Sequence, residues 1–444
     1  MNNAASHYDV VLGCHAELGG FGGSAIQAQE LAGACLAVGW KPLLRGFGDH
    51  ATRLANLPGD IPREDVDTSP RRGLWRVHTW CISRLLANHL RRLPRPRLAF
   101  VSFSPFWTVA AKRAWPDLPV VARYCGILSN CTRLARPPQQ RLGLWARVGD
   151  AGARAAEDQA FRLADRILVP TREHAEEISE FMRGANVRVV ECHEGCPVPV
   201  IDEVVRGRTR REFGFADGDF VSLAIGSFDR NKAFDYAIDE MAGVDPRGRL
   251  MIVGDGPERD ALKQLARERR VERRVHILGR QPDVAIWYAA ADCILSTSRY
   301  DTFPNTIKEA LCCDRLAIVP RHDPPHVYAG VSGLVERERL GFTYDRRQSG
   351  ALAACVNEMI TKRDTLGVQA IEAGAKARRM FTWDATLEQI RDVAQVEDET
   401  PLPRAADDDS AELLDADTAG NVACPSEPVC PGSIPTTTHG CRHE

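Results

Sequence analysis

Residues 298–314 read Ser-Arg-Tyr-Asp-Thr-Phe-Pro-Asn-Thr-Ile-Lys-Glu-Ala-Leu-Cys-Cys-Asp, and this pattern predicts a loop that enters a helix. The run just before it, Ala291–Thr297, is apolar between polar ends and is typical of a buried strand. Pro304 fits the first helical position, because its missing N–H costs nothing there and its φ is preset. The backbone amides of 305–307 would then point out of a helix N-terminus, which attracts anions.

Two carboxylates, Asp301 and Glu309, lie on either side of that expected helix start, with seven residues between them. A phosphate-bearing ligand whose hydroxyl groups need acceptors would account for both. The alternative is one carboxylate in a loop and one on a solvated helix face. This segment alone leaves both interpretations open.

The neighbouring segments repeat an order of strands, turns and helices. Leu250–Arg259 predicts a buried strand, a Gly-Asp-Gly-Pro turn and a helix start, Val275–Arg280 the next strand and turn, and Ala285–Asp292 a short helix. This order resembles the donor-binding half of the GT-B glycosyltransferases of family 4, the group 1 type. In that family a Glu-x7-Glu motif encloses Phe-Pro. Phe381-Thr-Trp-Asp384 is similar to the family's approach to its last helix, so the resemblance is close over 220–395 and looser over 8–200.

The bulk composition bounds the class of protein. A chain of 444 residues is long enough for two domains, and no apolar run approaches the ~20 residues of a membrane span. The first residues lack the features of a signal peptide, and the fourteen cysteines are scattered, so we expect a cytoplasmic protein with free thiols. A net charge of −3 argues against general nucleic-acid binding.

Charge is concentrated in one segment, 71–97, which holds eight arginines and no acid, together with Trp75 and Trp80. One interpretation is a basic, aromatic helix that contacts anionic lipid at the inner face of the plasma membrane. The simpler alternative is a solvated arginine-rich face. Membrane contact would suit the resemblance, because many family members act on acceptors held at the cytoplasmic leaflet.

Strands and helices alternate along most of the chain, which predicts an α/β fold with two Rossmann-like, doubly wound domains facing a central cleft. We expect an acceptor-side domain over 1–200, a donor-binding domain over 201–380, and, by resemblance, a helix over 381–395 that crosses back to the first domain. Expected elements of the first domain are strands at 8–14, 41–45, 98–102, 120–124, 166–170 and 187–190, and a helix from about Ser24 to Val38.

Beyond residue 395 the composition becomes acidic and then rich in Pro, Ser and Thr, which predicts a disordered tail over 396–444. Its potential metal ligands are Cys424, Cys430, His439, Cys441 and His443. Their spacing matches no structural zinc pattern, so we expect disorder and no metal.

A glycine-rich loop, Leu18–Ser24, follows the first strand and contains Gly20, Gly22 and Gly23. Its spacing satisfies a dinucleotide-binding motif, so an NAD(P)-dependent oxidoreductase is an alternative. Two observations oppose it: the first glycine does not come straight off the strand, and the strand at 41–45 ends in arginine where an acid should bind ribose. The resemblance implies a loop that closes over the donor's phosphates.

The segment Ile225–Asp235 resembles the family's Gly-Arg-x4-Lys-Gly loop. Lys232 matches the lysine, whose compact charge suits a diphosphate. Ser227 stands at the arginine position, and Arg230 in the same loop could supply the guanidinium. The alternative for Lys232 is a surface lysine at a helix start, which is a poor place for a cation unless an anion is present.

The resemblance also implies roles for the remaining donor-site residues. Glu309 would accept hydrogen bonds from the ribose hydroxyls, and Asp301, where the family more often has Glu, would lie near the transferred sugar. The residues expected along the rest of the donor are Gly279 and Arg280 at the base, and Phe303, Pro304, Asn305 and Thr306 at the helix start.

One departure lies in the first domain, where Cys125-Gly126 replaces the family's usual His-Gly. Cysteine cannot donate hydrogen bonds as imidazole does. Either Tyr124 or His15 takes over, or catalysis proceeds without this group, or the protein binds without turnover.

The residues and the resemblance together predict a glycosyltransferase that moves a sugar to a hydroxyl of a glycan, lipid-linked or small-molecule acceptor. The resemblance implies that the donor is a UDP- or GDP-sugar and that the anomeric configuration is retained. The expected catalytic residues are Asp301, Lys232, Glu309 and Cys125, with no metal or other cofactor. Ser227 and Cys125 motivate the alternative of a non-catalytic nucleotide-sugar or glycan binder on the same fold. The oxidoreductase is the less favoured third hypothesis.

Overall fold

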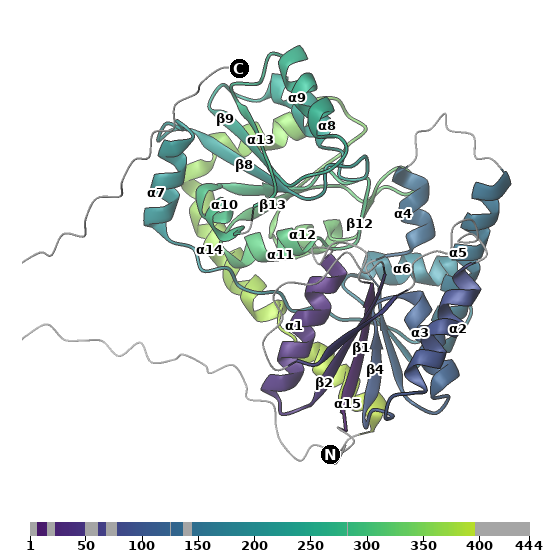
Figure 1. Ribbon diagram of the computed structural model, residues 1–444. Coiled ribbons are helices and arrows are strands. Elements are labelled where there is room, and N and C mark those ends of the chain that lie inside the picture. Colours follow the sequence, from purple (N-terminus) through teal and green to yellow (C-terminus); the bar gives the residue numbers. More distant parts are fainter. Residues whose placement is uncertain are drawn as a thin grey trace, which may run out of the picture. The chain divides into compact units, whose positions relative to one another are not determined.

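The computed structural model describes residues 7–15, 23–48, 61–67, 78–124, 126–135, 144–281 and 283–395, apart from some side chains within them. Within this part of the chain, two parallel sheets are each covered by helices (Figure 1).

The first sheet has seven parallel strands in the order β3-β2-β1-β4-β5-β6-β7. The strands are β1 (Val10–His15), β2 (Pro42–Gly48), β3 (Arg63–Asp67), β4 (Ala99–Ser102), β5 (Val120–Arg123), β6 (Arg166–Val169) and β7 (Val189–Glu191). The helices are α1 (Gly23–Ala37), α2 (His78–Leu90), α3 (Pro105–Ala114), α4 (Leu128–Ala135), α5 (Leu144–Leu163) and α6 (Arg172–Phe181). The strand order reverses between β1 and β4, where such sheets bind ligands.

Close packing of β1 against α3 requires a glycine in the strand. A Cβ built on Gly13 would lie 2.6 Å from the Trp107 ring, so a larger residue would clash. Trp107 is fully buried, and its Nε1 donates to the carbonyl of Cys14 at 2.9 Å. The end of β1 is therefore held firmly at the switch point.

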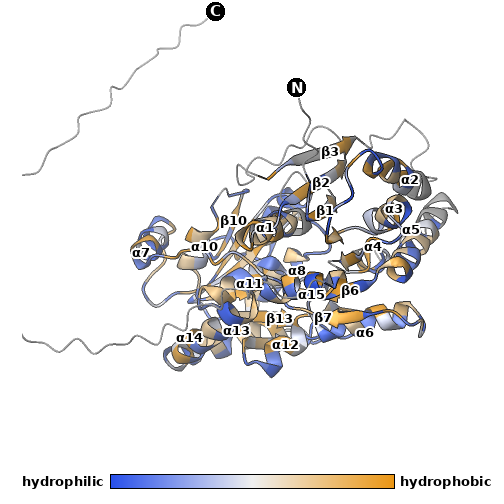
Figure 2. Ribbon diagram, turned by 90° about the horizontal axis from the view of Figure 1, so that it is seen from below, coloured by the Kyte–Doolittle hydropathy of each residue, from blue (hydrophilic) through white to orange (hydrophobic). Residues whose placement is uncertain are grey.

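The second sheet has six parallel strands in the order β10-β9-β8-β11-β13-β15. The strands are β8 (Phe220–Ile225), β9 (Gly248–Val253), β10 (Val275–Leu278), β11 (Cys293–Leu295), β13 (Leu316–Pro320) and β15 (Gly341–Tyr344), with a separate pair β12 (Tyr300–Asp301) and β14 (Tyr328–Ala329). The helices are α7 (Glu203–Glu212), α8 (Phe234–Glu240), α9 (Arg259–Glu268), α10 (Ala285–Ala290), α11 (Asn305–Cys312), α12 (Ser332–Arg337), α13 (Ala351–Thr361) and α14 (Arg363–Met380). Figure 2 shows apolar residues on strands such as β6 and β13 and polar residues on surface helices such as α7.

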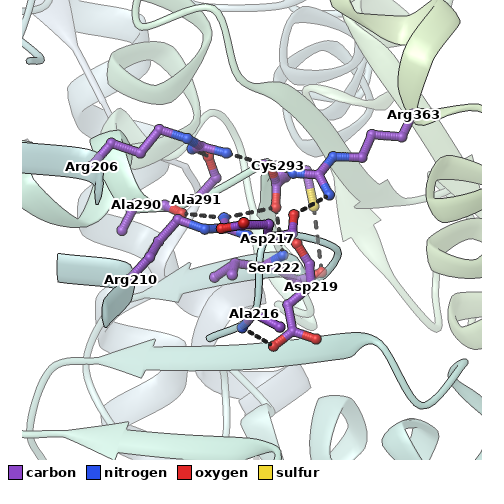
Figure 3. A network of polar contacts seen from close by, with 12 residues as sticks. Arg206, Arg210, Ala216, Asp217, Asp219, Ser222, Ala290, Ala291, Cys293 and Arg363 are labelled. Atoms are coloured by element: carbon purple, nitrogen blue, oxygen red, sulfur yellow. Dashed lines mark hydrogen bonds and ion pairs between the residues drawn. The ribbon is translucent and has the colours of Figure 1, made fainter. Parts of the chain in front are cut away.

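Asp292 explains why an Ala-Ala-Asp sequence follows α10. Its carboxylate accepts hydrogen bonds from Arg206 (2.6 Å) and Arg210 (3.1 Å) of α7, from Arg363 of α14 (3.5 Å) and from the Val221 amide (2.7 Å). Figure 3 shows the three arginines in the surrounding network. Although burial opposes ionisation, the arginines hold the pKa of Asp292 below its usual value. Asp292 therefore ties the amino-terminal ends of the central strands β8 and β11 to two helices and serves the fold.

The last helix, α15 (Asp384–Ala394), packs against elements of the first sheet (Figure 1). Arg166 of β6 donates to Gln389 at 2.7 Å, and the Cys192 thiol contacts the Thr386 hydroxyl at 3.6 Å. The Trp383 ring lies so close to Gly195 that a Cβ there would be 2.4 Å away.

Several boundaries differ from the sequence-based prediction. β2 continues three residues past Arg45, because Phe47 is buried even though glycines flank it. One of the two observations against a dinucleotide-binding motif, that this strand ends in arginine, is therefore wrong. β3 was not predicted, because its sequence Arg-Glu-Asp-Val-Asp is mostly charged, as an edge strand can be.

Two further boundaries are also corrected. The strand expected at 187–190 is β7, shifted to Val189–Glu191. Pro304 is the N-cap of α11 and not its first helical residue, since its φ of −58° is combined with an extended ψ of 132°. The preset φ of proline suits both conformations, so the sequence could not separate them.

Candidate functional site

The first turn of α11 forms one wall of the candidate site. The helix packs through Ile307, Ala310 and Leu311, all buried. The Ile307 amide, predicted to point outward, donates instead to the Pro304 carbonyl at 3.0 Å. The predicted anion site at the start of this helix is thus reduced to Asn305 and Thr306.

Lys232 and Asp301 form an ion pair, with 2.6 Å between Nζ and Oδ2. Lys232 lies in the turn after β8, and Asp301 ends β12. Although burial disfavours the charged amine, Asp301 raises the pKa of Lys232, so the lysine stays protonated. The structure therefore brings together the predicted phosphate-binding cation and the predicted sugar-side carboxylate.

The turn that carries Lys232 has a fixed backbone. Asp229 Oδ1 accepts from the amides of Asn231 (2.9 Å) and Lys232 (3.0 Å), which is an Asx-type turn. Ala233 follows in the left-handed region with φ of 51°. This conformation favours glycine, which accounts for the glycine after lysine in the family pattern.

Glu309 lies on α11 and accepts a hydrogen bond from the Tyr288 hydroxyl at 2.7 Å. Burial raises the pKa of Glu309. Burial and the charge of Glu309 also raise the pKa of Glu30, on α1 of the first sheet, to about 8. Glu309 therefore lies where the two halves meet. Sequence reasoning missed Tyr288, whose apolar helical surroundings look like core.

The other donor-site candidates of the second half are distributed around these residues. The Ser227 hydroxyl is engaged by Asp229, and the Arg230 carbonyl accepts from Arg299 at 3.2 Å. Gly279 and Arg280 follow β10, and a Cβ on Gly279 would lie 3.2 Å from the Arg259 guanidinium.

Phe303 serves packing within the core. Its side chain is 5% exposed, and its ring is 5.2 Å from the ring of Phe381. Pro304 is partly buried.

Two glycines that the sequence analysis did not select shape the floor of this region. Gly254 and Gly256 have φ of 149° and 159°, and a Cβ on Gly254 would lie 1.8 Å from the Gly226 carbonyl. The turn after β9 thus lies directly against the turn after β8, where only glycine fits. The Gly-Asp-Gly-Pro sequence signalled the turn but not this contact.

Tyr300 connects the reaction side of the second half with the first half. Its hydroxyl accepts from the Ile127 amide at 2.6 Å and donates to Glu177 at 2.9 Å. A Cβ on Gly126, at φ of 131°, would lie 2.6 Å from the same hydroxyl. The segment after β5 is thereby placed next to Asp301.

Several predicted residues lie outside the described residues: Gly20, Gly22, Cys125 and the 71–77 segment of the first half, and the cysteines and histidines of the tail. Gly23 begins α1. The proposed substitute Tyr124 is corrected: its hydroxyl is paired with Thr108 at 2.5 Å inside the core, so it cannot act in place of histidine.

A groove of about 820 Å³ lies beside the Tyr300 contact, between α4–α6 and the segment 322–328. Its walls carry four glutamates of α6, three arginines and the rings of Phe181 and Tyr328. Glu177 joins the groove to Tyr300, and burial raises the pKa of this carboxyl to about 7. The groove is therefore polar and of mixed charge, and Glu177 links it to Tyr300, the neighbour of Asp301 in β12. Among the described helices, none is long and apolar enough to cross a bilayer.

Comparison with known proteins identifies relatives of the second half most clearly. Residues 219–362 match the family model described as glycosyl transferases group 1. The chain is 26% identical over 271 residues to D-inositol 3-phosphate glycosyltransferase from Mycobacteroides abscessus, covering 58% of this chain and 57% of that protein. It is 29% identical over 192 residues to the lipopolysaccharide core biosynthesis glycosyltransferase LpsE from Rhizobium meliloti, covering 43% and 54%. The chain thus spans about half the length of these curated relatives.

Solved structures share the whole two-sheet arrangement. Anabaena Alr3699/HepE, solved in complex with UDP and glucose, aligns with a TM-score of 0.68 at 19% identity, covering 88% of this chain and 100% of that one. Sucrose-phosphate synthase from Thermosynechococcus elongatus aligns with a TM-score of 0.69 at 17% identity, covering 87% and 98%.

Proposed function

We propose that the protein transfers a sugar from a nucleoside-diphosphate sugar to an acceptor hydroxyl. The chain has the GT-B fold, and its residues 219–362 belong to the group 1 glycosyltransferases. The observation that carries the proposal is the Lys232–Asp301 ion pair at the turn after β8, inside the region that matches the family. If a phosphate took the place of Asp301 beside Lys232, the freed carboxylate could accept hydrogen bonds from the hydroxyl groups of the attached sugar.

The chemistry follows from charge development on the leaving group. When the sugar departs, negative charge grows on the diphosphate, and Lys232 with the first turn of α11 would stabilise it. As Lys232 turns toward the phosphate, Asp301 becomes available to accept hydrogen bonds from the sugar. Glu309 would accept from the ribose. Preorganised positive groups of this kind do the work that a metal ion does in other transferases.

The donor is proposed to be a UDP- or GDP-sugar, transferred with retention of the anomeric configuration. HepE, of the same fold, has been solved with UDP and with UDP-glucose, which supports UDP as the first nucleotide to test. Retention is the outcome expected if the leaving phosphate helps to deprotonate the acceptor hydroxyl on the face of the sugar from which the phosphate departs.

We place the acceptor along the groove beside Tyr300. Glutamates and arginines suit a ligand rich in hydroxyl groups, and the rings of Phe181 and Tyr328 suit the apolar face of a sugar ring. This arrangement would put the acceptor next to the sugar end of the donor.

The decisive experiment follows release of nucleoside diphosphate from a panel of UDP- and GDP-sugars, with and without added sugar and lipid acceptors. Release that depends on both substrates supports the proposal, and NMR of the product gives its anomeric configuration. If neither UDP nor GDP binds in calorimetry, the proposal is wrong.

A second candidate is a non-catalytic binder, favoured by Ser227, whose hydroxyl is engaged by Asp229 at the position of the family's arginine. Nucleotide binding without release across the acceptor panel would support the binder. A thermal shift with NAD(P)H and none with UDP or GDP would support the oxidoreductase.

We also propose that the protein works in the cytoplasm, at an anionic membrane surface contacted through 71–97. The nine described cysteines are free thiols, which suits a reducing compartment. On α2, Leu85 is 44% exposed beside the exposed Arg84. Co-sedimentation with vesicles should require phosphatidylglycerol and weaken with salt. If co-sedimentation is the same with pure phosphatidylcholine vesicles, the alternative of a solvated arginine-rich face is favoured.

A further inference from the structure

Four buried polar side chains connect the two sheets behind the candidate donor site. Glu194, after β7, accepts two hydrogen bonds from Arg123 at the end of β5 and one from Lys308 of α11 at 3.2 Å. Gln27 of α1 donates to the same carboxylate at 2.8 Å. The exposed fractions of Glu194, Arg123, Lys308 and Gln27 are 1%, 3%, 0% and 2%, and we call these residues the Glu194 network.

The network extends to the first turn of α11. The Gln27 amide nitrogen also donates to Asn305 Oδ1 at 2.6 Å, which is possible because an amide NH₂ carries two hydrogens. α11 is thus held at two points, through Asn305 at its first residue and through Lys308 one turn later. The starts of α1 and α11 meet at this contact (Figure 1).

Packing alone does not account for a lysine at position 308. The neighbouring inward positions are Ile307, Ala310 and Leu311, and an apolar side chain would fill the same space without burying a charge. Buried ion pairs add little net stability, and in some proteins they fix the relative position of the elements that they join. The joined elements here are the two helices whose N-termini are expected to face the donor's phosphates.

We propose that the Glu194 network positions the first turn of α11 against the start of α1, so that both face one diphosphate. This inference rests on the proposed function. Its residues act through α11 and do not touch the substrate, so they are positioning residues. The ligand class is the nucleoside diphosphate part of the donor.

Two substitutions loosen the network while leaving its charges balanced. Lys308→Met retains the Arg123–Glu194 pair, which is neutral by itself. Gln27→Leu removes the hydrogen bonds from Gln27 to Glu194 and to Asn305 but leaves both ion pairs of Glu194 in place. Both variants should therefore fold. Thr386→Val is the matched control, because Thr386 is 1% exposed and links α15 to Cys192, without contact to α11.

The test uses the full chain, UDP and GDP as probes, calorimetry for affinity and hydrogen exchange for the amides of α11. We expect Lys308→Met and Gln27→Leu to weaken binding of the preferred nucleotide about tenfold or more and to speed exchange at 305–308. Thermal midpoints should stay near that of the wild type, and acceptor KM should not change. Thr386→Val should leave nucleotide affinity as it is.

The outcomes separate this inference from the proposed function. If the wild type binds neither nucleotide, the proposed function fails, and unchanged exchange at 305–308 in the variants would then overturn the positioning role as well. If the wild type binds but both variants bind equally well, the positioning role alone is overturned. The same holds if Thr386→Val weakens binding as much as they do, because the effect would then be general stability.

Discussion

Lys232 and Asp301 are 69 positions apart in the chain but only 2.6 Å apart in the fold, which makes the lysine the most informative single residue to change. Lys232→Met should lower kcat/KM for the donor by about 10²–10³, because a preorganised cation at the leaving phosphate is lost. Nucleoside diphosphate release measures the effect. Lys263→Met on α9 is the control and should keep wild-type turnover. Equal turnover of the two variants would remove Lys232 from the mechanism.

Glu309 provides a test of binding as distinct from turnover. Glu309→Gln keeps the side-chain volume and still accepts from Tyr288, but loses the charge that we expect to bind ribose hydroxyls. Hydrogen bonds to a charged group contribute about 1.5–3 kcal/mol, so UDP or GDP affinity should fall about tenfold or more in calorimetry. Unchanged affinity would place the ribose elsewhere.

Glu30 should make stability depend on pH. Burial raises its pKa from 4.5 to about 8, so near neutral pH the folded protein holds a proton that the unfolded chain has released. The free energy of unfolding should therefore decrease as pH rises from about 4.5 to 8.

Glu30→Gln resembles the protonated form, so it should remove the part of this dependence that lies between pH 7 and 8, above the pKa of about 7 of Glu177, and be more stable at pH 8 by on the order of 2 kcal/mol. Urea denaturation between pH 7 and 8 is the measurement. Burial lowers the pKa of His174 from 6.5 to about 3, so this residue affects the pH dependence of stability only at pH values below 6.5. A variant no more stable than the wild type at pH 8 would contradict the expected protonation.

Among the elements, α9 offers a test of backbone conformation. It ends with Arg270 in the left-handed region at φ of 56°, and the Val271 amide donates to the Ala266 carbonyl as in a Schellman motif. Arg270→Gly should raise the free energy of unfolding by about 0.5–1 kcal/mol in urea. Arg267→Gly, inside the same helix, should lower it by about 1 kcal/mol. A loss of stability at position 270 would mean that its side chain makes an essential contact.

The elements also show which parts of the structure the sequence could predict. Apolar parallel strands such as 220–225 and 250–253 are buried on both faces, so local composition identifies them. β3 is an edge strand whose charged residues carry no such signal. The order of β8–β11 followed from the resemblance, but the sequence could not say that Pro304 precedes α11 or that Ile307 uses its amide locally.

For the candidate site, loop chemistry was predictable and partner choice was not. The turn sequences indicated that Lys232 and Asp301 belong to the same site. Their ion pair is a tertiary contact, which the sequence could not predict. The Glu194 network joins β5, the segment after β7, α1 and α11, and none of these carries a local pattern that announces a partner. Long-range polar contacts of this kind depend on the whole fold.

For the whole molecule, loss of the Glu194 carboxylate should lower stability strongly. Glu194→Gln leaves the guanidinium of Arg123 and the amine of Lys308 buried with no anion from this position. Breaking a buried pair in this way costs about 3–5 kcal/mol, measured by urea denaturation. Asp158→Asn, which removes an exposed pair with Arg162, is the control and should have little effect. A small effect at Glu194 would mean that water or a neighbouring acid compensates.

The return of α15 to the first sheet has a consequence for biosynthesis. Residues 383–394 are among the last of the described residues to leave the ribosome, yet they contact Arg166, Cys192 and Gly195, which emerge roughly two hundred residues earlier. The amino-terminal half must therefore wait, with part of its surface uncovered, until translation of the carboxy-terminal half is nearly finished. If the gene were divided between the halves, the amino-terminal half would be made without α15, which covers part of its surface.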